Sequence, residues 1–405
     1  MKDNFSVVSL FSGAGGMDLG FKNEGFEILW ANDFFKEAVD SYKKNIGNHV
    51  VYGDITKIPS SEIPDNPDIV IGGFPCQGFS IANTKRSMKD ERNFLYKELL
   101  RVIKDKNPKF FIAENVKGLL SMEDGKVIKM IVKDFEDLGY KVDYKVLNAA
   151  EYGVPQARER VIIIGNRLGL DNVFPEKTHF IKDEIKGLVK APTVKDTIKD
   201  LENIAISEKD VKVNGKIVHN HNAYTNVSSS YMGRSFDIDQ KELCVYLKKF
   251  KTLRKSSNTK IAIGINEPKT KVDHWFRSDS SGSIPGKEEY EKLKTFLDLD
   301  DEFDKVMEYE EKEISFEQSL RITNWDRPSD TITATGPEIH VNKKRRLSVR
   351  ECARLQTFPE DYIFTGSLDK MYRQVGNAVP VKLAECIASC IKKQLEDYTK
   401  KEESK

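Results

Sequence analysis

One cysteine stands out as a candidate reacting group. Residues 73–80 read Gly-Phe-Pro-Cys-Gln-Gly-Phe-Ser, so Cys76 follows Pro75 on a turn directly after the apolar run 68–72. The end of a buried strand, at the edge of a sheet, is where α/β proteins keep their reacting groups. A lone cysteine is more often an inert core residue, but its place on a Gly- and Pro-rich turn favours a nucleophile.

Other polar side chains close neighbouring apolar runs. Asp33 ends the second run, Asp54 follows the third, and Glu114 and Asn115 end the fifth. In a parallel sheet the carboxyl ends of the strands share one edge, and ligands bind in the crevice there. We therefore expect these groups to converge with Cys76 on one crevice.

The elements that must position these groups alternate between strands and helices. Helical periodicity is seen in residues 34–45, 94–106 and 127–138, and again in 348–358 and 379–395. Short β-rich runs occupy residues 7–11, 27–32, 50–52, 68–71, 110–113, 141–147 and 160–165. This alternation predicts an α/β fold with a doubly wound, mostly parallel sheet.

The middle of the chain lacks this pattern. Residues from about 166 to 325 are polar and lysine-rich, with Asn and Ser clusters, and βα alternation returns only weakly. We expect a catalytic and cofactor-binding domain over 1–174, a smaller irregular domain over 175–325, and a return to the first domain over 326–405.

Composition excludes several classes of protein. With 405 residues, 39% hydrophobic and 32% charged, the chain fits a globular protein, and no apolar run approaches the roughly 20 residues of a membrane span. Five cysteines without paired spacing predict neither a disulfide scaffold nor a metal site, and they favour the cytoplasm. Although the net charge is only +1, residues 245–260 carry six basic and no acidic side chains, which indicates a polyanionic partner.

A glycine loop follows the first strand. Gly13, Gly15 and Gly16 allow a tight turn and a close approach to a ligand. A dinucleotide fingerprint would have glycine where Asp18 stands, and no phosphate-binding Lys-Ser/Thr pair follows. With Asp33 suited to ribose hydroxyls and Asp54 to an exocyclic amine, the pattern fits S-adenosylmethionine. A structural turn with two helix caps is the alternative.

Six motifs in order resemble the DNA (cytosine-5)-methyltransferases of the compact prokaryotic restriction-modification type. They cover residues 5–167 and 320–395. They read Phe11-Ser-Gly-Ala-Gly-Gly16, Gly73-Phe-Pro-Cys-Gln-Gly-Phe-Ser80, Glu114-Asn-Val116, Gln156-Ala-Arg-Glu-Arg160, Arg327-Pro-Ser-Asp-Thr-Ile-Thr333 and Gln374-Val-Gly-Asn-Ala-Val-Pro380. The resemblance implies the S-adenosylmethionine-dependent methyltransferase fold, with residues 175–325 as a target-recognition domain.

The resemblance also implies a mechanism. Carbon 5 of cytosine becomes nucleophilic once a thiolate adds to carbon 6, and Cys76 matches the family's nucleophile. Glu114 matches the carboxyl that contacts ring nitrogen 3 and the exocyclic amine. Arg158 and Arg160 match arginines that contact the flipped base and the active-site loop. Residues 81–93 resemble a loop that closes over DNA, and the target base must leave the stack.

For the cofactor, the resemblance implies S-adenosylmethionine and a set of contact positions. Asp33 replaces a more usual Glu, and both carboxylates can hold a ribose diol. The matching positions are Phe11, Gly13, Ala14, Gly15, Gly16, Asp33, Phe34, Asp54, Ile55, Gly73, Pro75, Leu95, Asn377, Ala378 and Val379.

Two other functions compete with this assignment. A tRNA cytosine-5 methyltransferase of the same fold typically has Pro-Pro-Cys-Gln-Pro-Phe-Thr around its nucleophile, unlike residues 73–80. A catalytically silent DNA-binding subunit is disfavoured by the intact Cys76, Glu114 and Asp54. We expect a monomer that acts on double-stranded DNA, alongside a cognate restriction endonuclease acting separately. The recognition sequence cannot be read from residues 175–325.

Overall fold

The computed structural model describes residues 4–75, 95–213, 215–225, 323–334, 337–342 and 345–404. Cys76, the segment 81–93 and the basic stretch 245–260 lie outside the described residues. The chain forms two compact units: one comprises Met1–Asn222, Asn324–Gly336 and Ser348–Lys405, and the other Ala223–Thr323 and Pro337–Leu347. Every helix and strand named below belongs to the first unit. The functional boundaries after residues 174 and 325 remain a prediction.

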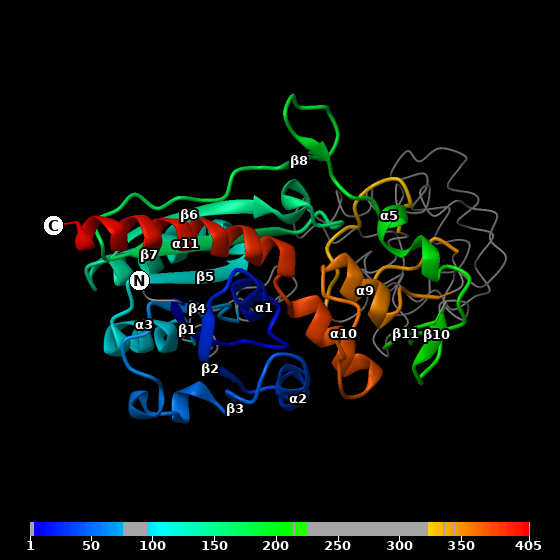
Figure 1. Cartoon of the computed structure of the whole chain (residues 1–405), viewed down its shortest axis with the longest axis horizontal. Helices are drawn as coiled ribbons and strands as arrows, with labels where there is room; N and C mark the ends of the chain where they lie inside the picture. Colours follow the sequence, from blue (N-terminus) through cyan, green and yellow to red (C-terminus); the bar gives the residue numbers. More distant parts are fainter. Residues whose placement is uncertain are drawn as a thin grey trace, which may run out of the picture. The chain divides into compact units, whose positions relative to one another are not determined.

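Seven strands form one sheet in the order β3-β2-β1-β4-β5-β7-β6 (Figure 1). The five strands from β3 to β5 run parallel, and β7 runs antiparallel to both of its neighbours. Their bounds are β1 Ser6–Leu10, β2 Glu27–Asp33, β3 Val50–Tyr52, β4 Ile69–Gly72, β5 Phe110–Val116, β6 Lys141–Asn148 and β7 Glu159–Asn166. The expected mostly parallel sheet is confirmed, and every strand end lies within three residues of its predicted position.

Helices cover both faces of the sheet, because alternate side chains of each strand point to opposite faces. Val7 packs in one core with α1 (Gly16–Asn23) and α11 (Val381–Glu403), which lies along the sheet in Figure 1. Val8 packs in a second core with α3 (Leu95–Lys106) and α4 (Lys126–Glu136). The sheet is therefore doubly wound, as the sequence predicts.

The remaining elements surround this sheet. They are α2 Lys36–Asn45, α5 Val194–Ile198, α9 Val349–Leu355 and α10 Leu368–Asn377, the short strands β8 His179–Phe180, β9 Val189–Lys190, β10 Val211–Val213 and β11 Lys216–Val218, and the 3-10 helices η1 Ile55–Lys57, η2 Ser60–Glu62, η4 Lys117–Gly125, η5 Ala149–Tyr152 and η6 Lys199–Leu201. Helices α1 and α10 were not predicted from the sequence.

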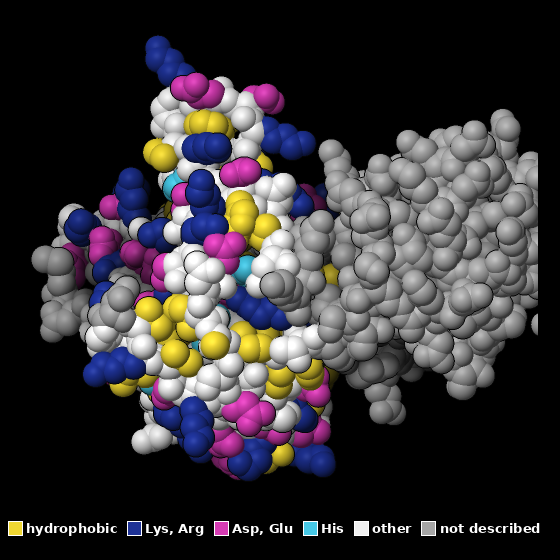
Figure 2. Space-filling model, turned by 90° about the vertical axis from the view of Figure 1, so that its right-hand side faces the viewer, with side chains coloured by type: hydrophobic (Ala, Val, Ile, Leu, Met, Phe, Trp, Pro, Cys, Tyr) yellow, Lys and Arg dark blue, Asp and Glu magenta, His cyan; other side chains and the backbone are white. Residues whose placement is uncertain are grey.

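Among the described residues, no helix is both long and apolar enough to cross a bilayer. Basic and acidic side chains are interspersed on the described part of the face shown in Figure 2. The acid-free run that suggested a polyanionic partner falls outside the described residues.

Candidate functional site

Loops at the carboxyl ends of neighbouring strands are fastened to each other. Ser12 N donates to Asn32 O at 3.0 Å, and Asn32 Nδ2 donates to Gly53 O at 3.0 Å. Asn115 Nδ2 donates to Phe74 O at 3.0 Å. The first two bonds join the ends of β1, β2 and β3, and the third joins the ends of β4 and β5. Of the groups predicted to converge, Asp33, Asp54, Glu114 and Asn115 thus share one edge of the sheet, and Cys76 lies outside the described residues.

The glycine loop requires glycine for close packing at two positions. Gly15 has a φ of 79°, and a Cβ there would lie 2.2 Å from Cδ1 of Ile46. A Cβ on Gly16 would lie 2.4 Å from the carbonyl oxygen of Val379. A Cβ on Gly13 would meet no described atom within 4 Å, so this side of the loop is open. The loop is therefore packed against the protein at Gly15 and Gly16 and accessible to a ligand at Gly13.

Asp33 is the buried carboxylate of this loop. Its Oδ2 accepts from Gly13 N at 2.8 Å and its Oδ1 from Phe35 N at 2.7 Å, and only 8% of the residue is exposed. Burial raises the pKa of Asp33, while the two backbone donors and the positive charge of Arg373 oppose the rise. Next to it, Phe34 is 58% exposed and presents an aromatic ring to solvent.

Asp54 is exposed and caps η1. Its Oδ1 accepts from Thr56 N at 3.1 Å and from Thr56 Oγ1 at 2.8 Å. Ile55, which follows, is buried in the core beneath α3. The cap predicted as the alternative role of Asp54 therefore exists, and the exposed carboxylate can still accept from a ligand.

Glu114 and Arg160 form a nearly buried ion pair. Arg160 Nε lies 2.7 Å from Glu114 Oε1, and the two residues are 9% and 8% exposed. Burial lowers the pKa of Arg160, and the charge of Glu114 opposes that change. A Cβ on Gly73 would lie 3.0 Å from Glu114 Oε2. The carboxyl group therefore lies directly against the segment that leads to Cys76.

Arg158 holds two distant segments of the chain. Its Nη1 donates to Ile332 O at 3.0 Å and its Nη2 to Gly376 O at 2.9 Å. The residue is 1% exposed, and its Nε makes no hydrogen bond among the described residues. Burial and the like charge of Arg160 lower the pKa of Arg158 well below its usual value. Arg158 thus connects three of the motifs.

Gln156 also connects these motifs. Gln156 Oε1 accepts from Ile332 N at 2.9 Å, and Gln156 Nε2 donates to Gln356 Oε1 at 3.0 Å. Ala157 N donates to Ser329 O at 2.8 Å. These contacts link the six motifs in a chain. The motif that begins at residue 11 contacts the one at 374, and the motif at 156 contacts those at 327 and 374. The motif at 114 contacts those at 73 and 156.

The other predicted cofactor positions surround the same loops. Ala14 is buried and its carbonyl accepts from the Tyr362 hydroxyl. Phe11 and Leu95 are partly buried against one core. Asn377 is exposed at the end of α10, and Ala378 follows it. Pro75 is the last described residue before the segment that contains Cys76.

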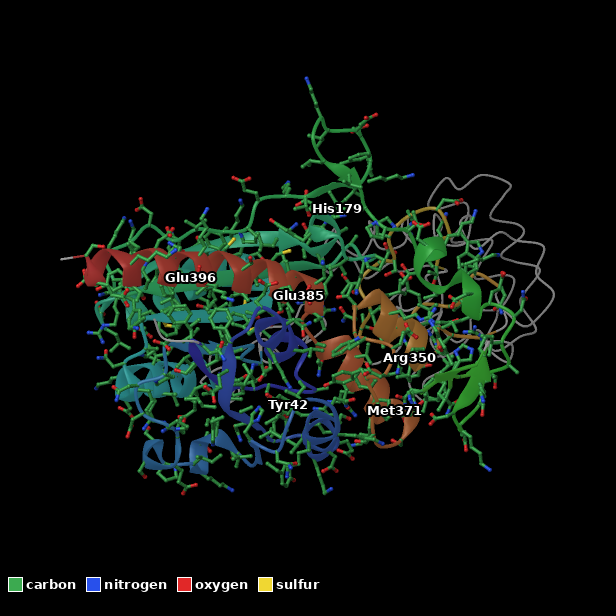
Figure 3. The ribbon with its side chains drawn as sticks, in the orientation of Figure 1. Tyr42, His179, Arg350, Met371, Glu385 and Glu396 are labelled. Carbon is green, nitrogen blue, oxygen red and sulfur yellow. The ribbon has the colours of Figure 1, made fainter. Side chains whose placement is uncertain are left out.

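A buried polar network beneath the glycine loop was missed. Asp18 is completely buried, and it accepts from Ser9 Oγ at 3.0 Å and from the hydroxyl of Tyr42 at 2.9 Å. Tyr42 is labelled in Figure 3. The same hydroxyl lies 3.0 Å from His49 Nε2. Burial raises the pKa of Asp18 to about 6. An acidic residue between the apolar Met17 and Leu19 was the only signal in the sequence.

The described cysteines are poor nucleophiles. Cys352 is completely buried in α9. Burial raises the pKa of Cys386 to about 11 and also raises that of Cys390. Since the thiolate is the nucleophile, these three are disfavoured. Cys76 and Cys244 lie outside the described residues.

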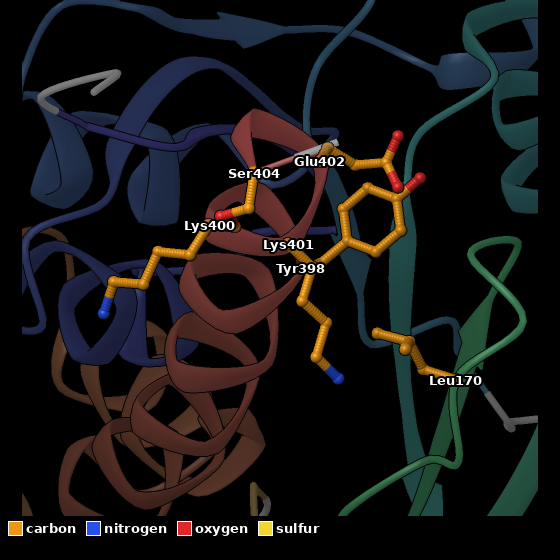
Figure 4. A pocket seen from close by; sticks show the side chains of 6 residues that line it. All are labelled: Leu170, Tyr398, Lys400, Lys401, Glu402 and Ser404. Atoms are coloured by element: carbon orange, nitrogen blue, oxygen red, sulfur yellow. The ribbon is translucent and has the colours of Figure 1, made fainter.

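A hollow at the C-terminal end of α11, away from the glycine loop, contains none of the predicted site residues (Figure 4). It is lined by Leu170, Tyr398, Lys400, Lys401, Glu402 and Ser404. We therefore place the site at the carboxyl edge of the sheet.

Comparison with known proteins finds relatives over nearly the whole chain. The sequence profile of the family described as C-5 cytosine-specific DNA methylase matches residues 5–393. Type II methyltransferase M.NgoFVII of Neisseria gonorrhoeae is 35% identical over 393 residues, covering 94% of this chain and 86% of that protein. Type II methyltransferase M.FnuDI of Fusobacterium nucleatum is 35% identical over 401 residues, covering 97% and 96%. The crystal structure of the S. pombe Dnmt2 methyltransferase has the same fold, with a TM-score of 0.52 and 16% identity over 97% of this chain and 99% of that one.

Proposed function

The chain belongs to the C-5 cytosine-specific DNA methylases, and we propose that it transfers a methyl group from S-adenosylmethionine to carbon 5 of a cytosine flipped out of double-stranded DNA. The family makes it a DNA (cytosine-5)-methyltransferase of the kind found in Type II restriction-modification systems. The observation that carries the proposal is the direct contact between the six family motifs at one sheet edge.

We call residues 11–16, 33–35 and 54–55 the cofactor half of this edge. Its open side at Gly13 and the exposed ring of Phe34 fit a nucleoside. Asp33 uses one lone pair of each oxygen on a backbone N–H, so one remains on each for the ribose hydroxyls. Asp54 is assigned to the adenine amine. When bound, S-adenosylmethionine supplies a methyl group carried on a sulfonium.

We call residues 73–76, 114–115 and 156–160 the base half. The thiolate of Cys76 forms a bond to carbon 6 of cytosine, and the displaced electron pair makes carbon 5 nucleophilic. Carbon 5 then accepts the methyl group as the methyl–sulfur bond breaks and S-adenosylhomocysteine leaves, and the carbon 5 proton passes to water. The remaining electron pair re-forms the ring double bond and expels the thiolate.

Glu114 is assigned to ring nitrogen 3 and the exocyclic amine of the base. Arg160 lies at its Oε1, so Oε2 is the oxygen assigned to the base. A proton donated to nitrogen 3 offsets the charge that develops as the thiolate adds. For Arg158, the carbonyl contacts to Ile332 and Gly376 favour a positioning role within the same site.

Methyl transfer to carbon 5 can be measured by mass spectrometry of nucleosides. The purified chain is incubated with S-adenosylmethionine and either genomic duplex DNA or tRNA, and 5-methylcytosine is quantified. We expect the product in DNA only, and none from a Cys76→Ser variant. Product in tRNA alone would support the tRNA enzyme, and product in neither would support a silent DNA-binding subunit.

We further propose that residues 175–325 choose the target sequence. Exchanging this segment for that of another such enzyme should move the methylated site, as detected by sequencing of the methylated DNA. An active chimera that still methylated the original site would contradict the division. The chain is proposed to act as a cytoplasmic monomer, with a cognate endonuclease that acts separately.

A further inference from the structure

Two cationic side chains of α10, Arg373 and Lys370, lie over the ring of Phe35 in the cofactor half. Cζ of Arg373 lies 4.6 Å from the centroid of the Phe35 ring, and Nζ of Lys370 lies 5.0 Å from it. Lys370 also lies 3.8 Å from a carboxylate oxygen of Glu37 on α2. Both positions suit a cation–π contact, but their surroundings differ, which makes Lys370 a matched control for Arg373.

The Phe35 ring belongs to the corner that Asp33 fastens to the glycine loop. Asp33 accepts from the backbone N–H groups of Phe35 and Gly13. Beyond Arg373, α10 leads into Val379, whose carbonyl packs against the same loop. The glycine loop, the Asp33 corner and α10 therefore form a closed ring of contacts, and Arg373 on Phe35 closes it.

Arg373 also acts on Asp33 through its charge. Burial favours the neutral carboxyl group, and the Arg373 charge is one of the effects that oppose burial and hold down the pKa of Asp33. The ionised form has acceptors left on both oxygens, whereas protonation turns one oxygen into a donor. The charge state of Asp33 therefore decides how well it accepts from two hydroxyls.

We propose that Arg373 is a positioning residue for the cofactor: it clamps the Asp33–Phe35 corner to α10 and keeps Asp33 ionised, so that both carboxylate oxygens accept from the ribose. This inference rests on the proposed function. Other titratable or charged groups in the elements around Asp33 include Asp18 and Lys22 on α1, Lys36, Glu37 and Asp40 on α2, Tyr52 on β3, and Asp369 and Lys370 on α10.

The sign of the pH effect follows from these charges. Without Arg373, the pKa of Asp33 rises further, so the carboxylate is lost at a higher pH as the solution is acidified. Cofactor affinity should then fall earlier on acidification than in the wild type. Asp18 also titrates near pH 6, but it is present in both proteins, so the difference between them isolates Arg373.

The test is calorimetric titration of the full chain with S-adenosylhomocysteine at pH 6 and pH 8.5. The ratio of the Kd of Arg373→Gln to that of wild type should be about threefold to tenfold larger at pH 6 than at pH 8.5, because the variant loses the Asp33 carboxylate at a higher pH. The same ratio for Lys370→Gln should stay constant. Arg373→Lys should restore most of the wild-type pH profile, because it restores the charge.

The structure predicts that Arg373→Gln folds, since Ser41 Oγ donates to Gln374 Oε1 at 2.6 Å and holds α10 to α2 independently. If it does not fold, Arg373→Met, which keeps an apolar chain over Phe35, carries the same test. A ratio that does not change with pH, or an equal change in Lys370→Gln, would overturn the inference. Wild type that fails to bind at pH 8.5 would instead contradict the proposed function.

Discussion

In the cofactor half, backbone N–H groups hold carboxylates, whereas in the base half guanidinium groups hold a carboxylate and backbone carbonyls. Gly13 and Phe35 donate to Asp33, so both of these donors come from within 20 residues of the carboxylate. Arg158 reaches Ile332 and Gly376, which lie 174 and 218 positions along the chain. The hydrogen bonds of Asp33 are thus local, whereas those of Arg158 form only when the chain returns to the sheet.

The two halves also differ in the direction of the pKa shifts of their buried groups. The cofactor half contains carboxyl groups, Asp33 and the underlying Asp18, whose pKa values are raised by burial. In the base half, burial lowers the pKa of both Arg158 and Arg160, yet guanidinium groups stay protonated in ordinary buffers. Of these groups, the buried carboxyl groups rather than the two arginines are therefore the ones that change charge with pH.

The largest expected effect is on catalysis in the base half. Glu114→Gln keeps the shape of the side chain but cannot donate a carboxyl proton. We expect kcat to fall by about 10²–10⁴-fold, with an unchanged Kd for S-adenosylhomocysteine. Single-turnover methylation of duplex DNA measures the first quantity and calorimetry the second. A parallel loss of cofactor affinity would show that the two halves are not separate.

Replacing Arg160 tests how much its ion pair with Glu114 contributes to the stability of the protein. Arg160→Ala removes the cation that pairs with the nearly buried Glu114 carboxyl group, so the free energy of unfolding should fall by about 3–5 kcal/mol. Urea denaturation measures this change. Arg160→Lys keeps the charge and should lose less, and equal losses in the two variants would contradict an electrostatic role.

Under the cofactor half, Asp18→Asn should change how stability depends on pH. The pKa of Asp18 is raised from 3.8 to about 6, so the folded protein binds this proton more tightly than the unfolded chain. The stabilisation is present below pH 4 and is lost as the pH rises to about 6, a difference of about 3 kcal/mol.

Asparagine has no such titration. The free energy of unfolding of the variant minus that of wild type should therefore increase by about 3 kcal/mol from pH 4 to pH 7. Urea denaturation at both values gives the comparison. A difference that does not depend on pH would show that Asp18 is ionised in the fold at an ordinary pKa.

The smallest expected effect concerns an exposed carboxylate of the cofactor half. Asp54→Ala removes one acceptor for the adenine amine, a loss of about 0.5–1.5 kcal/mol or roughly threefold to tenfold in Kd. It also removes the cap on Thr56. Thr56→Ala serves as a control that removes the hydroxyl contact alone, and if both variants bind S-adenosylhomocysteine like wild type, Asp54 is only a cap.

The sequence predicted the sheet well because most strands are short β-rich apolar runs, and polar residues such as Asp33 and Glu114 mark the ends of several of them. Helix α1 was missed because Gly16 and Gly20 weaken helix propensity. It forms by packing, since a Cβ at Gly20 would lie 2.5 Å from Cβ of Ala384 on α11. Helix α10 was missed in spite of its buried Met371, Tyr372 and Val375.

The residues of the site were predicted from motifs, but their pairing was not. Nothing in the local sequence indicates that Arg160 pairs with Glu114, 46 positions earlier, while Arg158 faces two carbonyls. The two arginines lie two positions apart, Arg158 just before β7 and Arg160 within it. Only the return of residues 327–376 to the sheet distinguishes them.

The central claim, that the base half directs Cys76 to carbon 6 of a cytosine, is tested most directly by trapping the adduct. Random-sequence duplex DNA containing 5-fluorocytosine is incubated with the chain and S-adenosylmethionine, and the cross-linked peptide is identified by mass spectrometry. We predict one covalent adduct, at Cys76, that is absent from Cys76→Ser. An adduct at Cys244 or Cys352, or active methylation with no adduct, would contradict the account.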